Sequence, residues 1–316
     1  HAEIDVPVPV EPAAPFAPVP VVVPPLSPAP PLLPPANLPP PGTAADVGRG
    51  KVGYDDGLYI ATADEEFRLK LGGWLIGRWG LASDADDVTQ RFAVPSARVE
   101  LTGAMFGNTT YALSAELGGG SAELRDAYVD RPLLGATLRI GAFKRPLSRQ
   151  FLTSRTKLQF TDRALTSAWL GEDRDVGASL GGHPAPTGAG VEWTVAAFSG
   201  YGSALHATCD AATPPTCGAP MTETADGRPT LVARVGWTSR MADGYDESDL
   251  DGGPARFAIA GGYLVDLADG ERADMTLQAT IDLSLKANGL SLAAAAFVVR
   301  GDDATGARAT TYGGHA

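Results

Sequence analysis

A basic segment stands out in an otherwise acidic chain. The formal net charge of the 316 residues is −12, yet the stretch 144–163 contains a single acidic residue, Asp162. Arginine presents a planar fork that matches phosphate or carboxylate oxygens, and lysine presents a mobile point charge. Side chains of this kind gathered on one segment indicate anion binding. The cations of this basic segment are Lys144, Arg145, Arg149, Arg155, Lys157 and Arg163.

The sequence on both sides of the basic segment alternates with a period of two, which is typical of β-strands. In 67–81 and again in 96–106, apolar residues and glycines occupy every second position. An apolar-out, polar-in alternation is typical of a transmembrane β-barrel wall, and the same pattern fits a soluble sandwich with an apolar core. The pattern alone leaves both folds open. The cations on its polar face are Arg68, Lys70, Arg78 and Arg98.

The connections between the predicted strands sort by length. Tight turns are predicted at 107–108, 132–135 and 288–289, all at one end of the strands, while the long connections, apart from 241–255, fall at the other end. Short turns on one rim and long loops on the other are typical of outer-membrane barrels. The basic segment is then the third long loop, and a long cationic loop on such a wall favours a pore with an anion filter.

The last predicted strand, 310–316, leaves an open edge, and backbone groups cannot stay unpaired in lipid. Ala316 also differs from the aromatic residue usual at the end of such barrels. We therefore expect either that the final strands are missing from this chain or that another segment closes the barrel.

A proline-rich arm precedes the barrel. Sixteen of the 26 prolines lie between Pro7 and Pro41, a composition that favours polyproline II and excludes helix or sheet ladders. We expect an arm over 1–54 and a barrel over 55–316. The G-x-G-x-x-G match at 48–53 follows this tract instead of a strand, so it does not predict a dinucleotide site. The chain starts at His1 without a signal peptide, which predicts a mature exported form with its arm in the periplasm.

Two smaller features allow specific predictions. Cys209 and Cys217 lie close together in a Pro/Gly/Thr-rich stretch, and we expect a disulfide, with two free thiols as the alternative. The acidic stretch 242–252 lacks the glutamate that closes a calcium loop, so we expect a solvated loop there.

Other classes of function are disfavoured. The histidines lack metal-ligand spacing, no G-x-S-x-G elbow occurs, and the carboxylates show no distinctive pairing. We therefore expect no catalytic residues, no metal and no cofactor. Nucleic-acid binding requires a broad basic face, which a sequence pI near 4.8 disfavours.

Four segments resemble the phosphate-selective porins O and P, namely 56–73, 96–117, 124–130 and 138–165. The last is the most specific, because its order G-x-F-K-x-P, Ser, L-T-S, Phe and x-R-A-L is similar to the constriction-loop signature of that family. The resemblance covers roughly residues 55–316. It implies an all-β fold, a transmembrane antiparallel β-barrel of about sixteen strands, which assembles as a homotrimer in the bacterial outer membrane.

The resemblance also implies a function. It predicts passive diffusion of inorganic anions such as phosphate or polyphosphate, past a third loop that folds into the lumen. Lys144 takes the place of the motif lysine, and Arg163 that of the arginine before Ala-Leu. Arg155 and Lys157 fall where the family is basic or polar, whereas Arg145 stands where an acidic residue is common.

Two alternatives stay open. The basic segment could be a solvated surface loop that faces anionic lipopolysaccharide instead of the pore. The protein could also be a structural outer-membrane anchor, whose residues 1–46 tether cell wall, envelope layers or a partner complex, with conduction incidental.

Overall fold

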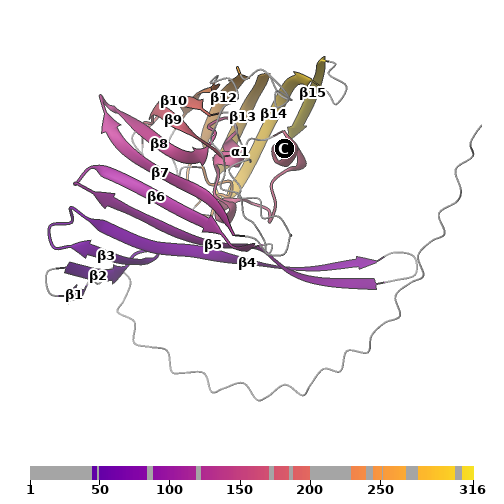
Figure 1. Cartoon of the computed structure of the whole chain (residues 1–316). Coiled ribbons are helices and arrows are strands. Elements are labelled where there is room, and N and C mark those ends of the chain that lie inside the picture. Colours follow the sequence, from indigo (N-terminus) through magenta and orange to yellow (C-terminus); the bar gives the residue numbers. More distant parts are fainter. Residues whose placement is uncertain are drawn as a thin grey trace, which may run out of the picture. The chain divides into compact units, whose positions relative to one another are not determined.

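The computed structural model describes residues 45–47, 50–83, 88–118, 122–170, 174–184, 188–199, 229–239, 245–250, 252–267, 277–302 and 308–316. The strands of these residues form one antiparallel sheet, in which each strand pairs with the next one along the chain (Figure 1). They are β1 (Ala45–Val47), β2 (Gly50–Tyr54), β3 (Leu58–Thr62), β4 (Arg68–Ser83), β5 (Val88–Met105), β6 (Thr109–Glu116), β7 (Glu123–Leu133), β8 (Ala136–Lys144), β9 (Arg174–Gly182), β10 (Gly190–Phe198), β11 (Thr230–Thr238), β12 (Arg256–Asp266), β13 (Leu277–Ala287), β14 (Leu290–Asp302) and β15 (Arg308–His315).

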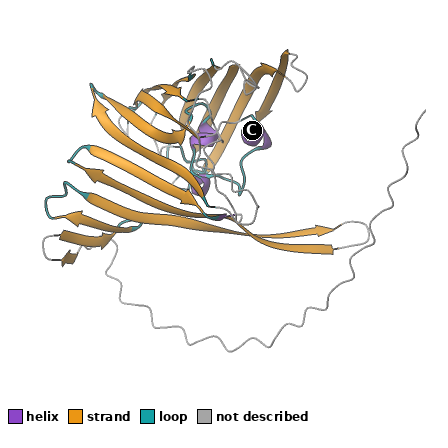
Figure 2. Cartoon of the chain, in the orientation of Figure 1, coloured by secondary structure: helices purple, strands orange, loops and turns teal. Residues whose placement is uncertain are grey.

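Short helices occur in the connection between β8 and β9. They are α1 (Arg149–Leu152), the 3₁₀ helix η2 (Arg155–Lys157) and α2 (Leu165–Trp169). Figure 2 shows these helices in purple, and the strands of the described residues in orange. No helix in the described residues is both long and apolar enough to cross a membrane.

The side chains of the sheet are arranged with the apolar ones outside and the polar ones inside. Leu75 is 72% exposed and Ile281 54% exposed, whereas Arg234 and Asp282 are only 4% and 3% exposed. A soluble sandwich would bury the apolar face and expose the polar one. The observed distribution therefore excludes the sandwich and confirms the predicted fold class, an all-β wall of the transmembrane barrel type.

Aromatic side chains lie on the apolar face close to the ends of the strands. Phe67 and Phe106 form an edge-to-face pair near the β5–β6 turn, and Trp237 and Phe257 pair beside the β11–β12 connection. All four rings are exposed on the sheet surface. Aromatic rings at these positions are typical of the interfacial girdles of membrane barrels.

Three tight turns lie where the sequence predicts them, between β5 and β6, β7 and β8, and β13 and β14. Each contains two successive residues with positive φ, as in the hairpin turns that match the twist of the strands. Because alternate connections of such a sheet lie at the same edge, these turns share one rim, called here the short-turn rim. The basic segment leaves β8 at the opposite end.

The β4–β5 hairpin is longer than the sequence predicts, and Figure 1 shows it extending past its neighbours. β5 begins at Val88, eight residues before the predicted start at 96. Pro95 breaks the alternating pattern because proline cannot donate a ladder hydrogen bond. The strands tolerate it beside an irregularity in register between Ile76 and Arg78.

The sheet begins upstream of the predicted boundary after residue 54. β1 pairs with β2, and β2 pairs with β3, so both lie in the same sheet as the wall strands. Most of the G-x-G-x-x-G match is therefore strand β2. The proline tract and the predicted Cys209–Cys217 disulfide lie outside the described residues.

The outward apolar face yields a test. Replacing Ile281, at the middle of β13, with arginine should destabilise the protein by about 2–4 kcal/mol in lipid, because it places a charge near the bilayer midplane. Leu292→Arg, three residues after the β13–β14 turn, should cost about 0–1 kcal/mol. Urea unfolding in lipid vesicles measures both, and equal losses for the two variants would contradict a lipid-facing surface.

Candidate anion pathway

The basic segment packs on the polar, concave face of the sheet, where Figure 1 shows α1. Leu147 of this segment is fully buried and packs in one hydrophobic cluster with Phe143, Phe198 and Val232. The carbonyl oxygen of Leu147 accepts hydrogen bonds from Arg234 Nη1 at 2.6 Å and from Thr280 Oγ1 at 3.1 Å. The segment is therefore attached to β11 and β13, which are far in sequence from β8 and β9, the strands that it connects.

An ion pair beneath the segment supports this attachment. Arg234 and Asp282 form two parallel hydrogen bonds of 2.7 and 2.9 Å, and both side chains are nearly inaccessible to solvent. Asp282 also accepts the backbone N–H of Arg149 at 3.1 Å, and Glu192 lies 3.7 Å from Arg234. The sequence places Arg234 on the polar face by alternation, but it does not reveal the partners.

Two predicted anion ligands hold the shape of the segment. Lys144 Nζ donates to the carbonyls of Phe151, Leu152 and Thr153 at 2.8–3.1 Å. Arg163 donates to the carbonyls of Gln150 and Thr153 at 3.2 and 2.9 Å. Carbonyls at the end of a helix lack backbone partners and carry partial negative charge, so cations stabilise them.

Arg163 also belongs to a group of neighbouring positive charges, called here the cation cluster: Arg98, Arg155, Arg163 and Arg174. Burial and the charges of Arg174 and Arg155 lower the pKa of Arg163 to about 10. The guanidinium therefore stays charged at neutral pH, within a positive field. Arg98 pairs with Glu116 at 3.2 Å, and Arg174 pairs with Asp126 at 2.9 Å.

The remaining predicted cations of the segment have acidic or aromatic partners. Arg155 and the wall residue Arg78 share Asp162, at 3.0 and 2.5 Å. The other contacts are Lys157 with Asp246 at 3.1 Å, Arg145 with Asp175 at 2.6 Å, and Arg149 over the ring of Tyr245 at 4.8 Å.

Two predicted wall cations lie closer to the short-turn rim. Arg68 pairs with Asp55 at 2.9 Å and stacks over Tyr59. Lys70 lies on the same strand face, half-buried. The structure thus brings Arg78 and Arg98 together with the basic segment, whereas Arg68 and Lys70 lie further along the wall.

The prediction of a solvated acidic loop at 242–252 is wrong for its described part. Glu247 and Asp249 are buried. Glu247 donates its N–H to the carbonyl of Lys157 at 3.0 Å, and its carboxylate accepts the N–H of Gln159 at 2.9 Å. These carboxylates can be buried because the basic segment supplies N–H donors and Arg256 supplies a positive charge.

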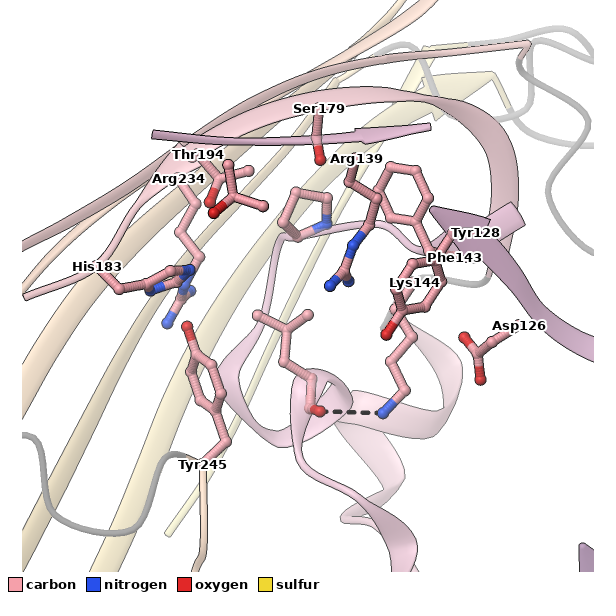
Figure 3. A pocket seen from close by; sticks show the side chains of 14 residues that line it. Asp126, Tyr128, Arg139, Phe143, Lys144, Ser179, His183, Thr194, Arg234 and Tyr245 are labelled. Atoms are coloured by element: carbon pink, nitrogen blue, oxygen red, sulfur yellow. Dashed lines mark hydrogen bonds between the residues drawn. The ribbon is translucent and has the colours of Figure 1, made fainter. Parts of the chain in front are cut away.

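A cavity of about 380 Å³ lies between the basic segment and the strands β7 to β11. Figure 3 shows Arg139, Tyr128, His183, Thr194 and Tyr245 around it. Their roles are absent from the sequence-based predictions. The period-two pattern is the signal that was available, since Arg139 falls on the polar face of its strand.

An apolar outer face, a polar inner face and a basic segment packed inside define a membrane barrel of the porin class. A family model of the phosphate-selective porins O and P matches residues 78–247, which is 170 of the 316 residues. The chain therefore belongs to the phosphate-selective porin O and P family, and the predicted family is confirmed. This is a family of outer-membrane channels, not a class of enzymes. A search of curated proteins finds no match.

The buried ion pair provides a second prediction. Asp282→Asn should lower the free energy of unfolding by about 3 kcal/mol or more, because Arg234 keeps its charge without a full partner. The change also weakens the attachment of Arg149, so limited proteolysis should cut the basic segment faster. Glu65→Gln, which alters the exposed pair with Lys51, is the matched control and should leave the unfolding curve unchanged. Equal behaviour of the two variants would contradict the anchoring role.

Proposed function

We propose that this porin passes inorganic anions such as phosphate or polyphosphate by passive diffusion, and that the basic segment is its filter. The observation that carries the proposal is the cation cluster, to which the segment contributes Arg155 and Arg163 and the wall contributes Arg98 and Arg174. Within walls of low dielectric constant, clustered cations lower the energy of a permeating anion far more than they do in bulk water.

The pairing of these cations with carboxylates suits conduction. A pore requires several sites of moderate strength in series, because one tight site would block the flux. Arg155, Lys157 and Arg78 each have a carboxylate partner, yet each keeps further N–H donors. A phosphate that exchanges between such donors competes with Asp162 and Asp246 and is released at each step.

The other predicted residues fit around this path. Arg145 holds the segment near the wall through Asp175 of β9, and Arg149 contacts Tyr245 of the β11–β12 connection. Arg68 and Lys70 would receive the anion nearer the short-turn rim, as positive charges further along the wall.

The proposal includes the assembly and the place of the protein. It comprises a homotrimer of barrels in contact with lipid and lipopolysaccharide, and a proline-rich arm in the periplasm. The anchor alternative, in which residues 1–46 tether a partner, stays a prediction from the sequence. Deleting residues 1–40 should leave conductance unchanged, and a loss of envelope integrity with that deletion would favour the tether.

Reversal potentials test the filter. In a planar bilayer with a KCl gradient, we expect the purified protein to be anion-selective, and we expect added phosphate to block the chloride current. A channel that is cation-selective, or that phosphate leaves unblocked, would overturn the proposal.

Two substitutions, one removing a carboxylate and one removing a cation, should change anion selectivity in opposite directions. Asp162→Asn removes the carboxylate that Arg78 and Arg155 share, so we expect a higher anion preference and phosphate block at lower concentration. Arg155→Gln should shift both quantities the other way. Lys51→Gln, which lies away from the basic segment, is the control and should change neither. Shifts of the same sign for the two variants would exclude this segment as the filter.

A further inference from the structure

The cavity beside the basic segment differs in chemistry from the cation cluster. Arg139 and Arg234 are paired within the wall, since Arg139 forms two hydrogen bonds of 2.7 Å with Asp130 and Arg234 forms two with Asp282. The lining residue Lys144 donates to backbone carbonyls and lies near the carboxylate of Asp126, which also lines the cavity. The cavity is therefore polar but close to neutral. A small inorganic anion has no electrostatic reason to leave the cation cluster for it.

Flat surfaces make up one side of the cavity. The guanidinium of Arg139 stacks on the ring of Tyr128 at 3.8 Å, and that ring meets Phe143 edge to face at 6.2 Å. In Figure 3 the guanidinium of Arg139 points into the cavity. Because Nε and Nη2 of Arg139 bind Asp130, Nη1 remains as a donor, held rigidly beside an aromatic face.

Hydroxyl and imidazole groups make up the other side. Thr194, His183 and the phenol of Tyr245 lie around the cavity in Figure 3. The phenol of Tyr245 donates to Glu192 at 3.3 Å, so its oxygen also remains an acceptor. Alternating donors and acceptors beside aromatic planes suit a ring that carries hydroxyl groups on its edge and C–H groups on its faces.

The cavity adjoins the cation cluster. Lys144 and Asp126 belong to its lining, and Asp126 pairs with Arg174 of the cluster through hydrogen bonds of 2.9 and 3.1 Å. Its volume of about 380 Å³ lies in the range of small-molecule pockets, roughly 300–1,000 Å³. A solute with a phosphoryl group at one end and a hydroxylated ring at the other would reach both regions.

We propose that the cavity is a second solute subsite of the pore, which binds the hydroxylated ring of a sugar phosphate while the phosphoryl group lies at the cation cluster. This inference rests on the proposed anion function and extends it to organic phosphate esters. The ring stacks on Tyr128 and Arg139, and its hydroxyl groups exchange hydrogen bonds with Thr194 and Tyr245.

Block of the channel current by different solutes distinguishes binding in the cavity from binding at the cation cluster. Purified full-length protein in a planar bilayer with KCl is titrated separately with inorganic phosphate, glucose 6-phosphate and glucose. We expect glucose 6-phosphate to halve the current at a concentration about tenfold below that of phosphate, since one stacked ring contributes about that factor. Tyr128→Leu should remove this advantage while leaving the block by inorganic phosphate within about twofold.

Matched variants keep the test decisive. Tyr263→Leu, the same change on the exposed outer face of β12, should leave all three titrations unaltered. Thr194→Val should weaken the block by glucose 6-phosphate severalfold, and it decides the question if Tyr128→Leu yields no channel in KCl alone.

The two proposals fail in different ways. If glucose 6-phosphate and phosphate block at equal concentrations in the wild-type protein and in both cavity variants, the subsite is disproved and the phosphate filter stands. If phosphate fails to block but glucose blocks, and Tyr128→Leu relieves that block, the filter is disproved and the cavity remains a sugar site.

Discussion

The structure depends on one constraint, which is that backbone polar groups facing hydrocarbon must find partners within the protein. A sheet in which every strand pairs with its sequence neighbour meets this requirement for β2 to β14, whereas β1 and β15 each have one edge without a partner strand among the described residues. The pleat then sends alternate side chains to lipid and to the interior. Ile281 and Asp282 are adjacent in sequence yet face opposite environments, one exposed to lipid and one nearly inaccessible.

Polar side chains on the inner face follow from that alternation, and they give the basic segment its attachment. An isolated charge there would be costly to bury, so the structure pairs Arg234 with Asp282 and Arg174 with Asp126. The pair at Asp282 has a spare acceptor, which receives the backbone of Arg149. The segment is thus held by the same groups that neutralise the wall.

Features that depend on neighbouring residues in the chain were predicted from the sequence. Alternation identified the strands and the inward direction of Arg98 and Arg234, and the Gly-Asn and Asn-Gly turns identified the short-turn rim. The sequence did not predict contacts between residues far apart in the chain, such as Lys157 with Asp246 or Asp162 with Arg78. Nor did it show that Lys144 donates its three N–H groups to carbonyls at the end of α1. Such partners depend on where the segment folds back onto the strand.

These long-range contacts show that the acidic residues of the chain act directly on the basic segment. An acidic chain with a basic island suggests a strong positive site, but most cations of the island meet a carboxylate or a carbonyl inside the barrel. The carboxylates of Asp162, Asp246 and Glu247 position the segment and at the same time weaken its field. The anion flux proposed above would require both effects, because an unpaired cluster would hold an oxyanion tightly and an unattached segment would not keep its donors in series. In the proposed function, the acidity of the chain is therefore part of the filter.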